Sequence, residues 1–383
     1  MNLEPSEEQA AARRLARDFT AREVIPYAAA WDRAESVDRA IVKKLGAVGF
    51  LGLTVPEEYG GSGGDHLAYA MVTEELGRGD SAVRGIVSVS LGLVAKTIAA
   101  WGTEEQKHAW LPRLCSGDAL GCFALTEPGT GSDAGHLTTR AERDGDSYVV
   151  TGGKTFITNG TWAGVVLLFA RTNDRPGHHG ISAFLVPADS PGLTRREIHG
   201  KLGLRGQATA ELAFDGVRVP VSAMLGPEGK GFSVAMSALA KGRMSVAAGC
   251  VGIAQAALDA AVSYATRREQ FGKPIAGHQL VQELIADISV DVDAARLLTW
   301  RVADLVDRGR PFAAEASTAK LFASEAAVRA AGNALQVHGG YGYIDEYPAG
   351  KLLRDARVMT LYEGTSQIQK LLIGRARTGV SAF

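Results

Sequence analysis

The hydrophobic and polar positions of the first hundred or so residues are arranged as in packed helices. Ser6 followed by Gln9 gives a capping-box signal at the start of the first helix. Thr103 followed by Gln106 repeats that signal ahead of another apolar stretch. This part of the chain is therefore predicted to be helical.

The pattern changes near residue 120, where short segments become rich in β-branched residues and alternate between apolar and polar positions. Residues 147–151, 165–169 and 182–186 show this alternation most clearly. Asp144-Gly145 and Asn159-Gly160 are typical turn sequences between such segments. A small β-domain is therefore predicted in the middle of the chain.

Long helical patterns return from about residue 230. Apolar residues over 284–305 fall at steps of three and four, and the Gly-Arg-Pro sequence at 309–311 ends this stripe. Similar stripes cover 253–264 and 316–335. Several long apolar stripes in succession predict a helix bundle.

The order of these patterns, helix then β then helix, indicates the α+β class without alternating βαβ units. A parallel nucleotide-binding sheet is therefore not expected. We predict an N-terminal α-helical domain over 1–118, a central small β-barrel or sandwich domain over 119–228, and a C-terminal four-helix bundle over 229–383.

Composition narrows the classes of function. The 383 residues are 46% hydrophobic and 22% charged, which is enough apolar material for a sizeable core. The formal net charge of -1 argues against a nucleic-acid partner. The three cysteines form no CxxC pair, which favours reduced thiols in the cytoplasm. No signal peptide is evident, and no apolar run approaches the length of a bilayer span, so no membrane interaction is expected.

Familiar catalytic motifs are weak or missing. The eight histidines include no HExxH pair, so no metal site is expected. The glycines at 129–134 begin like a dinucleotide fingerprint, but the pattern predicts no strand before them and no helix after them. Gly60-x-Ser62-x-Gly64 matches a serine-hydrolase elbow literally, yet loop residues flank it on both sides.

The segment Leu361–Gln369 carries the clearest candidate chemistry. Glu363 is its one carboxylate and precedes a glycine, with Thr365 and Gln367 following before an apolar stretch. A carboxylate on a tight turn, facing away from any charge partner, can be partly desolvated and act as a general base. Alternatively, Thr365 is a helix N-cap and Glu363 lies in solvent.

Two segments of the predicted β-domain add possible ligand contacts. Thr126 and Ser132 supply hydroxyls, and the glycines between them expose backbone N–H groups that can bind a flavin edge or a phosphate. The strand over 156–158 can place Phe156 and the hydroxyl of Thr158 against a flat ring. The alternative for Phe156 is an ordinary core position.

These segments resemble the motifs of the acyl-CoA dehydrogenase family, in matching order over essentially the full length of the chain. The segments that carry the resemblance are Thr126–Asp133, Lys154–Gly160, Arg267–Pro274, Gln336–Tyr343 and Leu361–Gln369. The resemblance implies an FAD-dependent oxidoreductase that acts on a CH–CH group. It also implies that FAD lies extended between the β-domain and the bundle, with its adenine end held partly by a second subunit.

The resemblance further implies roles for individual residues. FAD is expected to contact Phe123, Thr126, Gly131, Ser132, Phe156, Thr158, Arg268, Phe271, Gln336, Gly340, Thr365 and Gln367. The substrate is expected to contact Ser132, Arg243, Tyr362 and Gly364. Arg268 and Phe271 would reach FAD bound mainly by the neighbouring subunit. The alternative for Arg243 is a solvated helix cation, and the alternative for His338, in the same glycine run as Gly340, is a plain helix-end residue.

The implied reaction has Glu363 removing the α-proton of an acyl thioester while the β-hydride goes to flavin N5, which gives a trans-2-enoyl thioester. Some branches of the family place the base one residue before the position of Arg243, where this chain has Gly242, so Glu363 is the base that the motifs offer. The general likeness is to flavoproteins of fatty acid β-oxidation acting on short straight or branched acyl-CoA. Electron-transfer flavoprotein is the implied acceptor, and a homotetramer, a dimer of dimers, the implied assembly.

Two departures keep alternatives open. Ala240 stands where many relatives have Asp near the carrier arm of the substrate, and Lys351 replaces a common arginine. Residues 81–84 and 249–252 look somewhat like dehydrogenases that act on acyl groups tethered to acyl carrier protein in specialised biosynthesis. That activity is the first alternative, and a non-catalytic scaffold of the same fold is the second.

Overall fold

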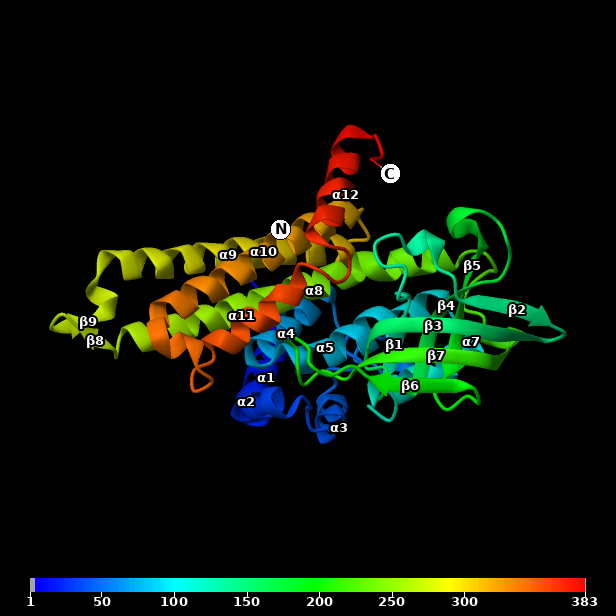
Figure 1. The fold of residues 1–383 in the computed structure, drawn as a ribbon, viewed down its shortest axis with the longest axis horizontal. Coiled ribbons are helices and arrows are strands. Elements are labelled where there is room, and N and C mark those ends of the chain that lie inside the picture. The colour runs from blue at the N-terminus through cyan, green and yellow to red at the C-terminus, as the bar shows by residue number, and fades with distance from the viewer. Residues whose placement is uncertain (1–3, 383) are drawn as a thin grey trace.

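Helices at both ends of the chain flank a curled β-sheet in the computed structural model, which describes residues 4–382 (Figure 1). The predicted α+β architecture is confirmed. Both predicted capping boxes are present: Ser6 caps α1 with Gln9, and Thr103 caps α7 with Gln106. The N-terminal elements are α1 (Glu7–Glu23), α2 (Ile25–Ala34), α3 (Ala40–Ala47), η1 (Glu57–Tyr59), α4 (His66–Gly79), α5 (Ser81–Val87), the π-helical η2 (Ser88–Ala95), α6 (Lys96–Trp101) and α7 (Glu104–Cys115).

In the described part of the chain, seven strands form one mixed sheet in the order β1-β4-β2-β3-β7-β6, with β5 pairing β4. These elements are β1 (Gly121–Ala124), η3 (Ala134–His136), β2 (Arg140–Asp144), β3 (Ser147–Thr158), β4 (Val165–Arg171), η4 (Gly177–Gly180), β5 (Ile181–Pro187), β6 (Leu193–Glu197), β7 (Thr209–Pro220) and η5 (Val221–Ala223). The predicted strands lie within β3, β4 and β5. The expectation that no strand precedes the 129–134 loop was wrong, because the buried β1 pairs in parallel with β4 just before it.

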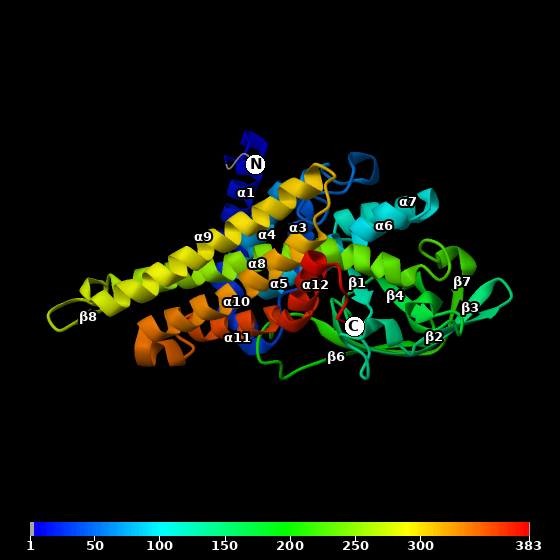
Figure 2. The same ribbon diagram turned by 90° about the horizontal axis from the view of Figure 1, so that it is seen from above.

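The C-terminal helices α8, α9, α10 and α11 pack on one another as the predicted bundle, and α12 projects beyond it (Figures 1 and 2). α9 ends before the Gly-Arg-Pro sequence, as expected. The elements are α8 (Gly231–Ala265), β8 (Glu269–Gln270), β9 (Lys273–Pro274), η6 (Ile275–Gly277), α9 (Gln279–Asp307), α10 (Ala313–His338), η7 (Gly339–Tyr343), α11 (Ala349–Met359) and α12 (Ser366–Thr378).

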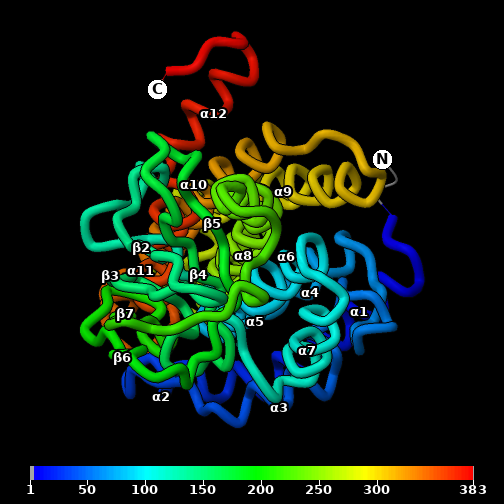
Figure 3. Tube along the Cα trace, turned by 90° about the vertical axis from the view of Figure 1, so that its right-hand side faces the viewer, coloured from blue at the N-terminus to red at the C-terminus, as the bar shows by residue number. Residues whose placement is uncertain are grey.

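The 35-residue helix α8 connects all parts of the fold. It packs against α4 and η2 of the N-terminal region, against β4 and β5 of the sheet, and against α9 and α10 of the bundle. Figure 3 shows α8 running through the centre of the molecule, between α4 and α10. Residues of α8 therefore face the other two regions at once.

Two segments are longer and more apolar than the sequence analysis expected. Ser81–Trp101, which comprises α5, η2 and α6, and the helix α8 both have the length and composition of a membrane span. The expectation that no apolar run approaches that length was wrong. However, 94% of the first apolar window and 67% of the second are buried inside the structure, as is usual for core helices of a folded protein.

Candidate active site

Glu363 lies on the turn that joins α11 to α12. Its backbone is left-handed, with φ of +51°, and Gly364 follows with φ of +94°. A left-handed backbone is uncommon for a residue with a side chain and is a frequent feature of functional turns. Thr365 caps α12 by accepting a hydrogen bond from the Ile368 N–H at 3.2 Å. The helix-cap interpretation of Thr365 was therefore correct, whereas the exposed position proposed with it for Glu363 was not.

Glu363 is half-buried, with one carboxylate oxygen inside the fold, and it is not neutralised by an ion pair within the described residues. Its Oε2 is inaccessible and accepts no hydrogen bond from residues 4–382. Burial raises the pKa of Glu363 to about 7, against the opposing charges of Arg84, Lys320 and Arg243. The expectation that Glu363 faces away from any charge partner was thus only half right, because cations lie near it although it forms no ion pair within the described residues.

The residues on either side of Glu363 are firmly held. Arg84 Nη2 donates to the Tyr362 hydroxyl at 2.6 Å, and Lys320 Nζ donates to the Gly364 carbonyl at 2.8 Å. Gln369 Nε2 donates to the carbonyls of Glu363 at 3.2 Å and Gly364 at 3.0 Å. The turn is therefore fixed through its neighbours rather than through the carboxylate itself.

Helix α8 forms the wall opposite Glu363. A Cβ added to Gly242 would lie 2.3 Å from Glu363 Oε2, so the carboxylate packs directly against the backbone there. Arg243 is buried, with 8% of its surface exposed, and burial lowers the pKa of its guanidinium. The interpretation of Arg243 as a solvated helix cation was wrong.

The β-domain presents an exposed aromatic ring and an open loop. Phe156 is 68% exposed and has a left-handed backbone with φ of +58°, so its interpretation as a core residue was wrong. Thr158 accepts a hydrogen bond from Gln207 Nε2 at 2.9 Å. In the nearby loop, a Cβ built on Gly129 or Gly131 would meet no atom of the described residues within 4 Å. Ser132 in this loop is exposed, while Phe123 and Thr126 are half-buried.

A buried ion pair, which the sequence analysis did not identify, supports that loop. Lys154 Nζ donates to Glu127 Oε1 at 2.8 Å and to the Leu125 carbonyl at 3.0 Å. Glu127 also accepts from the backbone N–H groups of Thr138 at 2.6 Å and Thr139 at 2.9 Å. Burial alone would raise the pKa of Glu127, but Lys154 and these hydrogen bonds outweigh it and lower the pKa to about 2.

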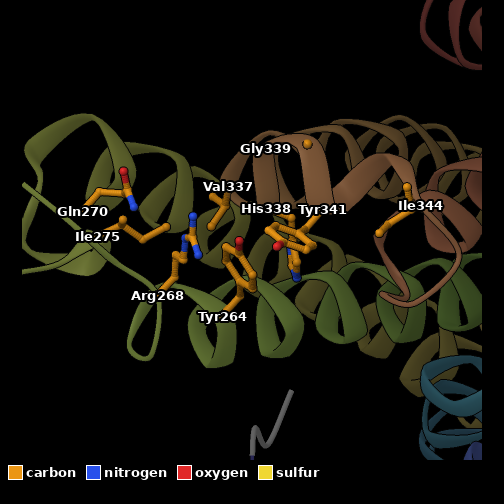
Figure 4. A pocket seen from close by; sticks show the side chains of 10 residues that line it. Tyr264, Arg268, Gln270, Ile275, Val337, His338, Gly339, Tyr341 and Ile344 are labelled. Carbon is orange, nitrogen blue, oxygen red and sulfur yellow. The ribbon is translucent and has the colours of Figure 1, made fainter.

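The predicted cofactor residues Arg268, Phe271, Gln336 and Gly340 belong to the end of the bundle at β8, β9 and η7, and the hairpin β8–β9 lies far from the start of α12 (Figure 1). A pocket of about 440 Å³ opens there between the end of α8, η7 and the β8–β9 hairpin. Its lining is drawn in Figure 4 and comprises Tyr264, Arg268, Gln270, Ile275, Val337, His338, Gly339, Gly340, Tyr341 and Ile344. Phe271, at the tip of the hairpin, is 93% exposed, and Gln336 is exposed nearby. The predicted cofactor residues therefore form two groups within one chain.

His338 ends α10 and lies inside that pocket wall. It is buried, stacks on Tyr264 with a centroid separation of 4.4 Å, and its Nδ1 lies 2.7 Å from the Ala334 carbonyl. The helix-end interpretation accounts for these contacts. Elsewhere, no group of three or more His, Cys, Asp or Glu within residues 4–382 is arranged to hold a metal ion.

Sequence models of three domains match this chain. They are the acyl-CoA dehydrogenase N-terminal domain over residues 6–118, the middle domain over 122–217 and the C-terminal domain over 229–377. The chain belongs to the acyl-CoA dehydrogenase family. It is thus an oxidoreductase that acts on CH–CH groups, and its cofactor is FAD.

Curated relatives match over nearly the whole chain. Short-chain specific acyl-CoA dehydrogenase, mitochondrial, from Homo sapiens is 48% identical over 357 residues, covering 93% of this chain and 87% of the relative. An acyl-CoA dehydrogenase of Bacillus subtilis is 46% identical over 374 residues, covering 98% and 99%.

Solved structures agree with this assignment. Butyryl-CoA dehydrogenase from Megasphaera elsdenii has a TM-score of 0.97 and 40% identity, covering 98% of this chain and all of that one. A chain from a study of the electron transferring flavoprotein of Acidaminococcus fermentans has the same TM-score and identity, with 99% of this chain covered and 100% of that one. Glutaryl-CoA dehydrogenase from Mycobacterium smegmatis with FADH2 has a TM-score of 0.95 and 36% identity, covering 99% and 96%. The prolyl acyl carrier protein oxidase AnaB has a TM-score of 0.93 and 30% identity, covering 98% and 100%.

The residues present fit FAD. The exposed ring of Phe156 and the half-buried hydroxyl of Thr158 lie on the same strand, where a flat ring system has something to pack against. The glycine loop over 129–131 leaves its backbone uncovered by any described residue, as close approach of a ligand requires. Phe156, Thr158 and this loop would hold the ring end, while Thr365 and the exposed Gln367 begin the helix beside the base.

Arg84, Lys320 and Gln369 were missed as parts of the site. Their partners lie 278, 44 and 5 or 6 residues away in sequence, so spacing does not reveal the contacts made by Arg84 and Lys320. One signal was available, because Arg84 is one of only two charges in the long apolar run Ser81–Trp101. A charge in such a run is either paired or functional.

Proposed function

We propose that this enzyme dehydrogenates short-chain acyl-CoA thioesters, straight or branched, to trans-2-enoyl thioesters, with Glu363 as the general base. The observation that carries the proposal is the carboxylate of Glu363, whose Oε2 is inaccessible and accepts no hydrogen bond from the described residues, and whose pKa is raised to about 7. A general base works best when its pKa lies near the operating pH.

The turn supplies the other group that proton removal needs. As the α-proton leaves, negative charge develops on the thioester oxygen and must be stabilised by hydrogen-bond donors. The backbone N–H of Glu363 donates to no carbonyl within residues 4–382, so it remains available to that oxygen. FAD held by Phe156, Thr158 and the 129–131 loop would supply the acceptor for the hydride of the β-carbon. Glu363 therefore contributes its carboxylate and its backbone to the same step.

The preference for short chains is supported by the relatives, which include a short-chain enzyme at 48% identity and a butyryl-CoA dehydrogenase at 40%. A second candidate is oxidation of an acyl group on a carrier protein. It is supported by a prolyl acyl carrier protein oxidase, which has the same fold at 30% identity, and by Ala240, where the family resemblance implies an aspartate near the carrier arm.

The setting of the enzyme is also part of the proposal: a cytoplasmic homotetramer, built as a dimer of dimers, that serves fatty acid β-oxidation and passes electrons to electron-transfer flavoprotein. Large apolar side chains at the outer end of the bundle support the assembly, since Phe271 is 93%, Tyr343 87% and Leu280 75% exposed in the single chain. Arg268 and Phe271 would then contact FAD of a neighbouring subunit. Light scattering tests this, and a monomer with full FAD occupancy would contradict it.

Anaerobic absorbance of the purified enzyme tests the reaction itself. Butyryl-, isobutyryl-, octanoyl- and glutaryl-CoA are titrated separately, and bleaching of the flavin band is followed. Bleaching by butyryl- or isobutyryl-CoA at low concentration supports the proposal. A flavin spectrum that resists all of the CoA thioesters but bleaches with butyryl-acyl carrier protein establishes the second candidate instead.

A further inference from the structure

Two buried cations hold the residues that flank Glu363, and they come from different helices. Arg84 of α5 is 2% exposed and donates to the Tyr362 hydroxyl at 2.6 Å. Lys320 of α10 is fully buried and donates to the Gly364 carbonyl at 2.8 Å. Within residues 4–382, neither cation forms an ion pair with Glu363 or with any other carboxylate.

This arrangement is costly for folding. A buried cation is normally balanced by a carboxylate within hydrogen-bond distance, as Lys154 is by Glu127 at 2.8 Å. Arg84 instead has only neutral partners in the described residues, the Tyr362 and Ser88 hydroxyls and the Met359 sulfur, and its Nε has none. Burial lowers the pKa of Lys320 to about 8. Packing alone gives no reason to keep two such charges at one turn.

We propose that Arg84 and Lys320 are positioning residues that clamp Tyr362 and Gly364, and that their charges hold Glu363 ionised while leaving its proton-accepting oxygen free. A direct salt bridge would also ionise Glu363, but it would occupy that oxygen and weaken the base. When the cations bind the neighbouring residues instead, Glu363 is kept ionised and its proton-accepting oxygen stays unoccupied. The inference rests on the proposed role of Glu363 as the general base.

Other groups near the base come from each helix packed around it. They are Tyr69 of α4, Arg84 of α5, Arg243 and Cys250 of α8, Lys320 and Glu325 of α10, and Tyr362 of the turn itself. Glu325 accepts a hydrogen bond from the Ser366 hydroxyl at 2.5 Å. The cations among these groups oppose the effect of burial on Glu363. Removing either clamp charge therefore leaves the effect of burial less opposed and makes Glu363 harder to ionise.

The test measures ionisation of Glu363 directly. Infrared spectra of the FAD-loaded enzyme are recorded from pH 5 to pH 9, and the spectrum of Glu363→Gln is subtracted so that the carboxyl band of Glu363 remains. The titration midpoint is compared for wild type, Arg84→Met and Lys320→Met. We expect the midpoint to rise by about one pH unit or more in each variant, since a nearby buried charge is worth at least that much.

Three further variants separate charge from packing. Lys320→Gln keeps a donor for the Gly364 carbonyl without the charge and should shift the midpoint as Lys320→Met does. Lys320→Arg keeps the charge and should restore the wild-type midpoint. Lys201→Met is the matched control, because Lys201 also donates to a backbone carbonyl, that of Ile198 at 3.0 Å, but lies away from Glu363. It should leave the midpoint unchanged.

The pH profile of kcat/KM for butyryl-CoA gives the functional readout. Its acidic limb reports the base of the free enzyme, so it should move to higher pH with the infrared midpoint. Activity of Lys320→Gln should then fall about tenfold at pH 6 and much less at pH 9. A variant that was merely misfolded would lose activity equally at both.

An unchanged infrared midpoint in Lys320→Gln or in folded, FAD-loaded Arg84→Met would overturn the proposal for that residue. If Arg84→Met keeps the midpoint but loses activity only toward acyl-CoA with a terminal carboxylate, Arg84 binds substrate rather than positioning the base, which also overturns its part. Turnover retained by Glu363→Gln would contradict the proposed function instead, whatever the midpoints, so the two failures are distinguishable.

Discussion

Glu127 and Glu363 both place carboxylate oxygen inside the fold, yet the surroundings of the two carboxylates are opposite. Glu127 accepts from the Lys154 ammonium at 2.8 Å and from backbone and hydroxyl donors at 2.6 and 2.9 Å, and its pKa falls to about 2. Glu363 Oε2 accepts nothing from the described residues, and its pKa rises to about 7. The difference lies in direct donors and not in burial, since burial raises the pKa of both.

The comparison shows how one chain makes a carboxylate structural in one region and basic in another. At Glu127 the cation touches the carboxylate, so the proton is held off and the loop around it is fixed. At Glu363 the cations touch the neighbouring residues, so the turn is fixed and the carboxylate stays able to take a proton. Substitutions at Glu127 and Lys154 should therefore change stability, whereas substitutions at Glu363 should change the reaction rate.

The largest effect is expected from Glu363→Gln, which removes the base but keeps the shape. Flavin reduction by butyryl-CoA should slow about 10³–10⁴-fold, the usual contribution of a general base. FAD content should stay close to wild type, and the melting temperature at pH 7 should be no lower than that of wild type. Anaerobic stopped-flow absorbance measures the rate, with Glu127→Gln as the contrasting variant that loses stability instead. Near-normal flavin reduction by Glu363→Gln would show that Glu363 is not the general base.

Lys154→Met should have the next largest effect, on stability rather than on rate. It leaves Glu127 buried without its cation, which typically costs about 3–5 kcal/mol. Urea unfolding at pH 7 measures this. The double variant with Glu127→Gln should recover part of the loss, because the uncompensated charge is then gone. A loss under about 1 kcal/mol for Lys154→Met would show that the pair does not support the loop as described.

The two glutamates should also respond to pH with opposite sign. The folded pKa of Glu363 is raised from 4.5 to about 7, so its ionisation destabilises the fold as the pH rises from about 5 to 8. Glu363→Gln should therefore gain about 2–3 kcal/mol of unfolding free energy relative to wild type between these values. Glu127 has a depressed pKa, so its contribution is present above about pH 4.5 and is lost as the pH falls toward 2. Chemical unfolding at pH 5 and pH 8 checks the first sign, and equal gains at both would contradict it.

The smallest effect is expected from Gly242→Ala, which tests how closely Glu363 packs on α8. The added Cβ would meet Glu363 Oε2 at 2.3 Å, so the carboxylate must shift. We expect flavin reduction to slow about tenfold and stability to fall by about 1 kcal/mol, as in mild overpacking. Gly332→Ala in α10 is the matched control, because its Cβ would meet nothing within 4 Å of the described residues. Equal effects of the two substitutions would mean that the contact at Gly242 does not matter.

Much of the architecture was predictable because it depends on local patterns. Ser6 and Thr103 begin helices through capping boxes, and the apolar stripe of α9 faces the bundle. The strand β1 was not predicted, since its four residues show neither alternation nor length and their pairing with β4 joins positions 44 apart. The apolar run Ser81–Trp101 was underestimated because its charges are few and lie near its ends.

The candidate site was predictable only in part. Glu363 and Phe156 stand in local turn and strand sequences that fit a site, and the structure gives both unusual backbone conformations. The clamp was not predictable, because it brings α5 and α10 to the turn after α11. Whether a cation touches a carboxylate or its neighbours depends on distances of a few ångströms, which no sequence spacing encodes.

The central course of α8 has a consequence for local opening of the molecule. A helix that packs on both other regions cannot detach without disrupting them, so its middle should open only when the whole protein unfolds. The β8–β9 hairpin beyond its end has an exposed tip and should open far more easily. Amide hydrogen exchange should therefore be slowest near the middle of α8 and much faster in the β8–β9 hairpin, so that two adjoining segments of the chain differ greatly in protection.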